Sequence, residues 1–248
     1  MIGIQLDTMT SRQRVLHTFA HEKADRIPTD YFANPHVNTR LAKFLGVEDS
    51  REAVSCALGT DFKELMPRYI GKPLFAPREN RRVNPLLGSV TRWVGNESGG
   101  YWDFCDFPLA DAEEETIANW PVPNPDDFDY DELYEKCKLY KDKAICFGHQ
   151  GISDVMNTLG MLRGMENIYM DLALENEGTI ALIDRRVQAE LGMFERMLAK
   201  CKDEVALIWT GEDLGTQHTP LISLPMFRTH IRPKHQLLID LAASYQKP

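Results

Sequence analysis

Two adjacent carboxylates, Glu212 and Asp213, follow a short apolar run near the C-terminal end of the sequence. The run, Val205–Trp209, has the composition of a strand that is buried on both faces of a sheet. In α/β proteins, chemistry is carried out by residues at the C-terminal ends of such strands. We therefore predict Glu212 and Asp213 to be catalytic. Gln217 and His218, on the same loop, are predicted to bind substrate. The alternative is that the two carboxylates only cap the next helix and solvate a turn.

A second apolar run, at residues 143–148, repeats this pattern and is followed by His149 and Gln150. An imidazole titrates near neutral pH, so His149 is predicted to be a general acid or base, or a ligand. Gln150 is predicted to bind substrate. The alternative for both residues is an ordinary polar loop at the end of a strand.

Three further polar residues adjoin candidate strands in the first quarter of the chain. Asp30 and Asn34 close a short candidate strand at residues 27–32, and they are predicted to bind substrate. Asp61 leads into a candidate strand at about residues 63–69, and it is predicted to be catalytic and to line the pocket. The alternative is that Asp61 caps a turn after Gly59.

Histidines and carboxylates are also the residues that bind zinc, and a zinc hydrolase could be assembled from His149, His218, Glu212 and Asp213. No spacing motif such as HExxH supports that assignment, so no metal site is predicted. The five cysteines are scattered and never stand in CxxC spacing. We expect reduced and mostly buried thiols rather than disulfides.

The composition is that of an ordinary globular protein, with 248 residues, 43% hydrophobic and 26% charged. A formal net charge of −9 argues against nucleic acid or an anionic membrane as the main partner. The sequence shows no apolar segment of about 18 residues and no N-terminal signal pattern. We therefore expect a single domain spanning residues 1–248, a cytoplasmic location and a small-molecule substrate.

The elements that must position these residues follow from caps and periodicity. Helices are predicted to begin after a capping box at Thr10 and to end at Gly46 and at Gly59. A long helical region is predicted at residues 153–201, with interruptions near positions 160, 164, 177 and 178, and a helix bent at Pro233 follows at residues 224–245. Residues 71–130 form an irregular, aromatic-rich excursion that contains a hairpin at about residues 83–101.

The alternation of strands and helices predicts a parallel sheet with right-handed crossovers, and therefore an α/β fold. About four strands are visible. A complete eight-stranded barrel does not fit within this sequence.

Several segments, taken in order, resemble the uroporphyrinogen decarboxylase-like superfamily. They are TSRQRVL from Thr10, HEKADRIP from His21, LGTD ending at Asp61, PLAD from Pro108 with the WP at Trp120, GEDLGTQ from Gly211, PLIS from Pro220 and MFR from Met226. That superfamily comprises heme-pathway decarboxylases and corrinoid-dependent methyltransferases. The resemblance implies a TIM-type (β/α)8 barrel that is incomplete at its C-terminus, and the family's dimers imply a homodimer.

The decarboxylase branch binds a substrate with many carboxylates through an arginine-rich segment after the first strand. Here the corresponding residues 30–40 contain Arg40 alone of that type, although arginine forks are the natural clamp for carboxylates. The resemblance aligns Asp61 with the aspartate that gathers the pyrrole N–H groups. It places the family's active-site tyrosine near Leu159, which cannot replace it.

The methyltransferase branch binds zinc through a His-x-Cys pair and a later cysteine, which this resemblance would place beyond residue 248. The sequence contains no His-x-Cys, so zinc is expected only if those further residues exist. We expect a corrinoid-linked methyltransferase that acts on a small molecule, with a corrinoid protein as partner. The alternatives are decarboxylation of a uroporphyrinogen-type substrate, and a non-catalytic truncated remnant or binding subunit.

Overall fold

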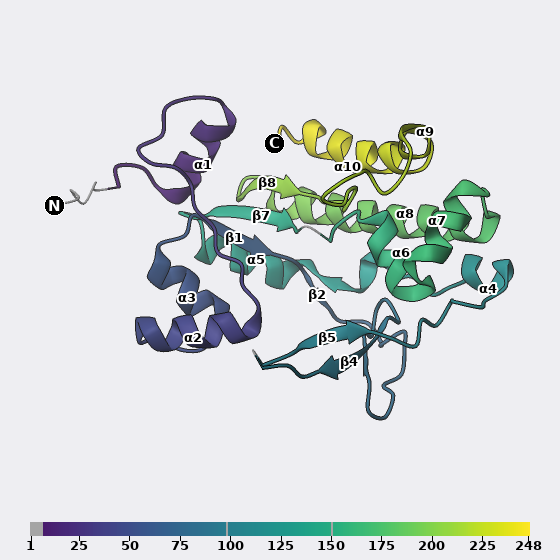
Figure 1. The fold of residues 1–248 in the computed structure, drawn as a ribbon. Coiled ribbons are helices and arrows are strands. Elements are labelled where there is room, and N and C mark those ends of the chain that lie inside the picture. Colours follow the sequence, from purple (N-terminus) through teal and green to yellow (C-terminus); the bar gives the residue numbers. More distant parts are fainter. Residues whose placement is uncertain (1–6, 98, 150) are drawn as a thin grey trace.

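The computed structural model describes residues 7–97, 99–149 and 151–248. At its centre lies a three-stranded parallel sheet, in the order β1 (Phe62–Leu65), β7 (Ala144–Gly148) and β8 (Val205–Trp209) (Figure 1). The two apolar runs predicted to be buried strands of a parallel sheet thus form strands, and the structure makes them neighbours. The protein is a mixed α/β fold, and within the described ranges its parallel sheet stays open.

Helices cover one face of this sheet. Both α5 (Tyr130–Leu139) and α8 (Glu177–Cys201) pack there, because their apolar stripes match the side chains that β7 and β8 direct to that side. The residues buried together on this face include Leu133, Cys137, Ile145, Phe147, Phe194, Leu198 and Val205. Each such side chain contributes roughly 1.5–3 kcal/mol when it leaves water.

The opposite face, called the inner face below, is covered only in part. Helix α1 (Ser11–Phe19) packs its Val15 against Ala144, Cys146 and Ala206. The chain exposes 14795 Å² of surface, whereas a compact monomer of this length exposes about 11,000 Å². The difference agrees with a sheet whose inner face is left partly open.

The segment at residues 27–32 forms no strand, so that prediction was wrong. Among the described residues, one hydrogen bond between backbone groups joins it to the start of β1, from Asp61 N–H to the Thr29 carbonyl (2.8 Å). Ile27 and Phe32 remain 82% and 67% exposed, so the segment buries too little apolar surface to be held as a paired strand. At the other edge of the sheet, Ile208 N–H donates to the carbonyl of Pro248 (3.0 Å).

The predicted helix boundaries are largely confirmed. Thr10 and Gln13 form the capping box of α1. Helices α2 (Pro35–Leu45) and α3 (Arg51–Leu58) end at Gly46 and Gly59, which adopt φ values of +69° and +67°. Glycine reaches this left-handed region without a Cβ clash, and it therefore terminates both helices.

The long helical region divides into α6 (Val155–Arg163), α7 (Met165–Ala173) and α8. The breaks fall at Gly164 and just before Glu177, close to the predicted interruptions. Near the start of α8, the short helix α4 (Glu114–Ala118) packs against it. Within the described ranges, no helix combines the length and the apolar character needed to cross a bilayer.

The C-terminal helical region begins at α9 (Leu224–Met226), with Ser223 as its N-cap, and continues through one wide π-helical turn, Phe227–Ile231. Helix α10 (Arg232–Ser244) completes it. The predicted irregularity near Pro233 is therefore present as a widened turn just before the proline.

The excursion at residues 71–130 holds most of the antiparallel structure. Strands β3 (Arg82–Val83), β4 (Val90–Val94) and β5 (Tyr101–Phe104) form a small sheet with the predicted hairpin turn. A two-residue pairing of β2 (Arg68–Tyr69) with β6 (Phe128–Asp129) connects the excursion to the central part of the protein. In Figure 1 the small sheet lies below the parallel sheet.

Candidate functional site

The loops that follow β7 and β8 meet at the C-terminal end of the sheet. The Gly211 N–H and the Thr210 hydroxyl both donate to the carbonyl of Ile152, at 3.1 and 2.8 Å. This contact holds the start of the β8 loop against the chain that leads into α6. The predicted site residue Glu212 therefore reaches the N-terminus of that helix.

The carboxylate of Glu212 is buried, with its side chain only 2% exposed. It accepts hydrogen bonds from the N–H groups of Val155 (2.7 Å) and Met156 (3.0 Å). These donors belong to the first turn of α6, where the helix dipole favours a negative charge. His235 of α10 brings its Nε2 to 3.1 Å from the same carboxylate and to 3.0 Å from the Ser153 carbonyl. A carbonyl can only accept, so Nε2 carries the proton.

A second carboxylate, Asp154, lies beside Glu212. Asp154 is the N-cap of α6 and accepts from the Asn157 N–H at 2.9 Å. Burial and a hydrogen bond with Glu212 raise the pKa of Asp154 to about 7. The hydrogen bond that His235 donates to Glu212 also raises the pKa of His235. Asp154 and His235 thus flank Glu212, and both hold a proton more tightly than they would in water.

This cluster extends to α8 through Glu190, which accepts from the Ser153 N–H at 3.1 Å and lies 3.5 Å from Arg186. Burial raises the pKa of Glu190. The space between Asp154 and these two residues measures about 10 Å³, room for one water molecule and no more. A substrate would have to approach the cluster from another side.

Sequence reasoning found Glu212 and missed its partners. Neither Asp154 nor His235 was among the residues predicted for the site. Neither lies near Glu212 along the chain, so only the packing of α6 and α10 reveals the cluster.

The other predicted residues of the β8 loop do not join it. Asp213, Gln217 and His218 are exposed on a loop closed by a bridge between Gly215 and Pro220. The β7 loop holds His149, half-buried, whose Nδ1 accepts from the Gly151 N–H at 3.0 Å. Gln150 lies outside the described residues.

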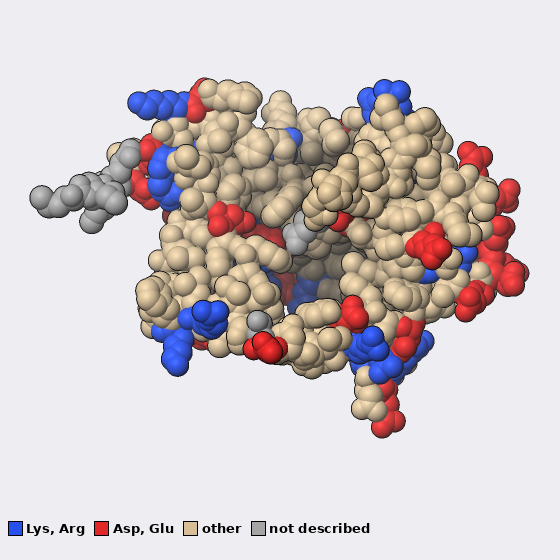
Figure 2. Space-filling model, viewed as in Figure 1, with Lys and Arg blue, Asp and Glu red and all other residues tan. Residues whose placement is uncertain are grey.

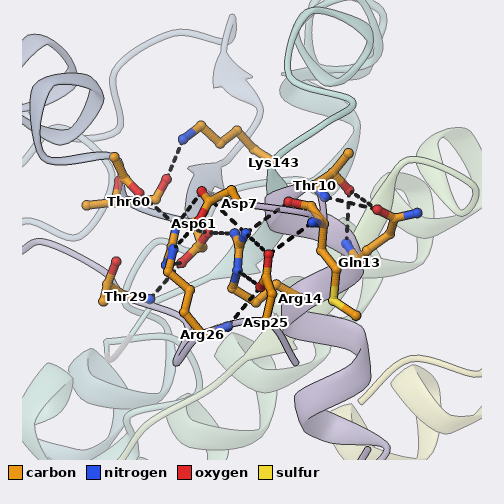
Figure 3. A network of polar contacts seen from close by, with 12 residues as sticks. Asp7, Thr10, Gln13, Arg14, Asp25, Arg26, Thr29, Thr60, Asp61 and Lys143 are labelled. Atoms are coloured by element: carbon orange, nitrogen blue, oxygen red, sulfur yellow. Dashed lines mark hydrogen bonds and ion pairs between the residues drawn. The ribbon is translucent and has the colours of Figure 1, made fainter. Parts of the chain in front are cut away.

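Asp61 lies at the N-terminal end of β1, whereas Glu212 follows the C-terminal end of the parallel strand β8. Its fully buried carboxylate accepts from Arg14 at 2.5 Å, from Arg26 at 2.6 and 3.0 Å, and from the Thr29 N–H at 2.8 Å (Figure 3). Burial alone would raise the pKa of Asp61, but these donors lower it below its ordinary value. Four donors fill the lone pairs of the Asp61 carboxylate, so none is left for a substrate N–H.

Asn34, another predicted substrate-binding residue, is also engaged. It is the N-cap of α2 and accepts a hydrogen bond from the Val37 N–H.

A cavity of about 620 Å³ extends over the inner face and around the edge of β1. Seven described residues of the sheet line it: Phe62, Lys63, Glu64, Cys146, Leu207, Ile208 and Trp209. Asp30, a predicted substrate-binding residue, lines it from the segment beside β1, and Arg51 lines it from α3. Figure 2 shows a hollow near the centre of the viewed face, with charged side chains visible inside it.

Two of these residues form an ion pair across the cavity wall, with Arg51 Nη1 3.4 Å from Glu64 Oε2. Burial, followed by the charges of Glu64 and Asp30, raises the pKa of the Cys146 thiol to about 12. A thiol in that state is a poor nucleophile and a poor metal ligand. Among the described residues, no group of three or more His, Cys, Asp and Glu side chains could hold a metal ion.

Comparisons with protein-family models, with curated proteins and with solved structures find no match for this chain.

Proposed function

We propose that the chain forms part of an α/β-barrel enzyme of the uroporphyrinogen decarboxylase-like kind, which acts on a small molecule by corrinoid-linked methyl transfer. One observation supports a barrel fold. Five pieces of the chain lie side by side in the order of the sequence: segment 27–32, β1, β7, β8 and residue 248. Helices α5 and α8 pack on a single face of this row. Sequential strands with helices on the outer side are the arrangement of a (β/α)8 wall.

The cavity supports action on a small molecule. Its volume of about 620 Å³ falls within the ~300–1,000 Å³ of small-molecule pockets. Asp154, whose pKa is raised to about 7 beside Glu212, would supply a general acid or base near neutral pH. The other residues proposed for the C-terminal end of the sheet lie on the loops after β7 and β8, and they would reach a substrate only if these loops closed over it. They are His149, Asp213, Gln217 and His218.

Methyl transfer is favoured over porphyrinogen decarboxylation by the charges of the cavity. Its three basic residues, Arg51, Lys63 and Lys143, are each bonded to a protein acceptor. A substrate with many carboxylates would need unengaged arginine forks. The described residues do not provide the set of ligands that a zinc site needs. A corrinoid on a partner protein would supply the methyl group, and the resemblance implies a homodimer.

The test is an assay of the whole chain with methylcobalamin and a small thiol, followed by the absorption spectrum of the corrinoid. We expect loss of the methyl group, and slower loss in a Glu212→Gln variant. A parallel incubation with uroporphyrinogen measures release of carbon dioxide. Decarboxylation without methyl transfer would establish the alternative reaction, and the absence of both would indicate a non-catalytic or binding role.

A further inference from the structure

The cavity on the inner face contains three acidic and three basic side chains, and they differ in how far they are satisfied. Lys63 donates to Glu52 at 2.9 Å and lies 4.1 Å from the centre of the Tyr140 ring. Lys143 donates to the backbone carbonyl of Thr60. These two cations lie on the outer, β1-edge side of the cavity, and both are already engaged.

Arg51 is engaged as well. Its Nε donates to the Tyr31 carbonyl at 3.4 Å, and its guanidinium lies 4.9 Å from the centre of the Phe32 ring. Its 3.4 Å contact with Glu64 is long for a charged hydrogen bond and leaves most of that carboxylate free.

Asp30 is the less satisfied of the two carboxylates that face the inner side. Within the described ranges, its hydrogen bond is with the N–H of its own neighbour, Tyr31, at 2.7 Å. No cation of the described chain lies within ion-pair distance of it. The inner side of the cavity therefore holds two carboxylates, Asp30 and Glu64, and one cation, Arg51. The groups there that can still bind a partner are hydrogen-bond acceptors.

Both carboxylates line the cavity. Glu64 pairs in register with Cys146 of the middle strand, so these two side chains lie on the same face of the sheet. Asp30 reaches the same cavity from the segment beside β1. The charges of Glu64 and Asp30 both raise the pKa of the Cys146 thiol.

The remaining lining of this side is aromatic and aliphatic. Phe19 is 49% exposed and Trp209 37% exposed, while Phe62 and Leu207 form the floor. Aromatic faces attract organic cations, and a nearby carboxylate adds a separate attraction between opposite charges. A neutral ligand would leave Asp30 unpaired, and an anion would face two carboxylates in a chain of net charge −9.

We propose that this cavity binds a small organic ammonium ion, with its charge facing Asp30 and Glu64 and its alkyl groups against Phe62, Leu207 and Trp209. If the cavity is the substrate pocket, as the proposed function requires, the substrate is an alkylammonium compound.

Ligand-observed NMR titration tests this with three probes of similar size: tetramethylammonium, the neutral tert-butanol and the anionic pivalate. Ionic strength is matched with sodium chloride. We expect saturable binding of tetramethylammonium, weaker binding of tert-butanol and none of pivalate. Asp30→Asn should weaken binding of tetramethylammonium about three- to fivefold, the range of a partly exposed charge pair. The matched variant Asp111→Asn, on an exposed turn outside the cavity, should leave it unchanged.

Equal binding of the three probes, or an Asp30→Asn variant that binds tetramethylammonium as tightly as the parent chain, would overturn the proposal. Asp30 is exposed, so its variant is expected to fold, and a thermal unfolding curve verifies that. No methyl donor is present in this titration. Ammonium binding without methyl transfer would therefore refute the reaction class alone, and methyl transfer without ammonium binding would refute the ligand class alone.

Discussion

The Nε2 atom of His235 lies 3.1 Å from the carboxylate of Glu212, and this contact joins α10 to the end of β8 and to the start of α6. Hydrogen bonds of Glu212 and of the Ile152 carbonyl already join the β8 loop to α6, and the imidazole adds α10 to them. Its protonation state governs how strongly α10 is held there.

His235→Ala should destabilise the protein by about 1–2 kcal/mol at pH 5.5, since it removes a charged hydrogen bond. The folded pKa of His235 is raised by Glu212. Its contribution is therefore complete below the ordinary value of about 6.5 and is lost as pH rises through the higher folded value. Urea denaturation from pH 5.5 to 8.5 measures this, with the exposed His218→Ala as control. An equal loss at every pH would contradict a charged His235.

Asp154→Asn should stabilise the protein above pH 7. The folded pKa of Asp154 is about 7, so the native state binds a proton that the unfolded chain releases near pH 4, and stability falls as pH rises between these values. Asparagine is as good an N-cap and can donate to Glu212 without a charge. We expect a gain of roughly 2–4 °C in Tm at pH 8, which corresponds to about 1 kcal/mol, and no gain at pH 4. Asp129→Asn, at the N-cap of α5, serves as the comparison and should show no gain at pH 8.

Asp61→Asn should destabilise the fold by about 3–5 kcal/mol, because it leaves the buried guanidinium of Arg14 without part of its counter-charge. The measurement is the urea midpoint at pH 7, with Asp142→Asn on the exposed turn before β7 as control. A loss below about 1 kcal/mol would mean that the paired Asp25 suffices for Arg14.

Gly148→Ala should destabilise the protein by about 3 kcal/mol or more. Gly148 ends β7 at φ +96°, and an added Cβ would collide with the backbone carbonyl of Trp209 on β8. Thermal unfolding compares it with Gly215→Ala, where the nearest atom is 3.8 Å away and little change is expected. Equal effects of the two substitutions would show that β7 and β8 can separate at this end.

The strands and caps that sequence reasoning could predict are those fixed by neighbouring residues. β7 and β8 are continuous apolar runs buried by their surroundings, and Gly46 and Gly59 end helices through their own φ angles. The segment at residues 27–32 has a strand-like composition, but only distant residues could have paired with it. Local pattern contains no information on that pairing.

The candidate site was harder to predict for a related reason. Asp61 adjoins a strand, and its role depends on which end of the strand it occupies: β1 begins at Phe62, so Asp61 lies at the N-terminal end. Glu64 stood within the predicted strand, and its charge in a half-buried run was the signal for the cavity. The partners of Glu212 come from α6 and α10, and no spacing rule connects them.

The wide turn Phe227–Ile231 sets the rotational orientation of α10, which follows it. One residue corresponds to about 100° of rotation in an α-helix, and a π-helical turn accommodates one residue more than an α-turn does. Deleting a residue such as Thr229 would let the helix close into a regular α-turn and would rotate α10 by about that angle. His235 would then turn away from Glu212, and Leu238 and Ala242, which are 2% and 6% exposed, would turn toward solvent. The turn therefore acts as a register insertion that sets which side of α10 meets the sheet.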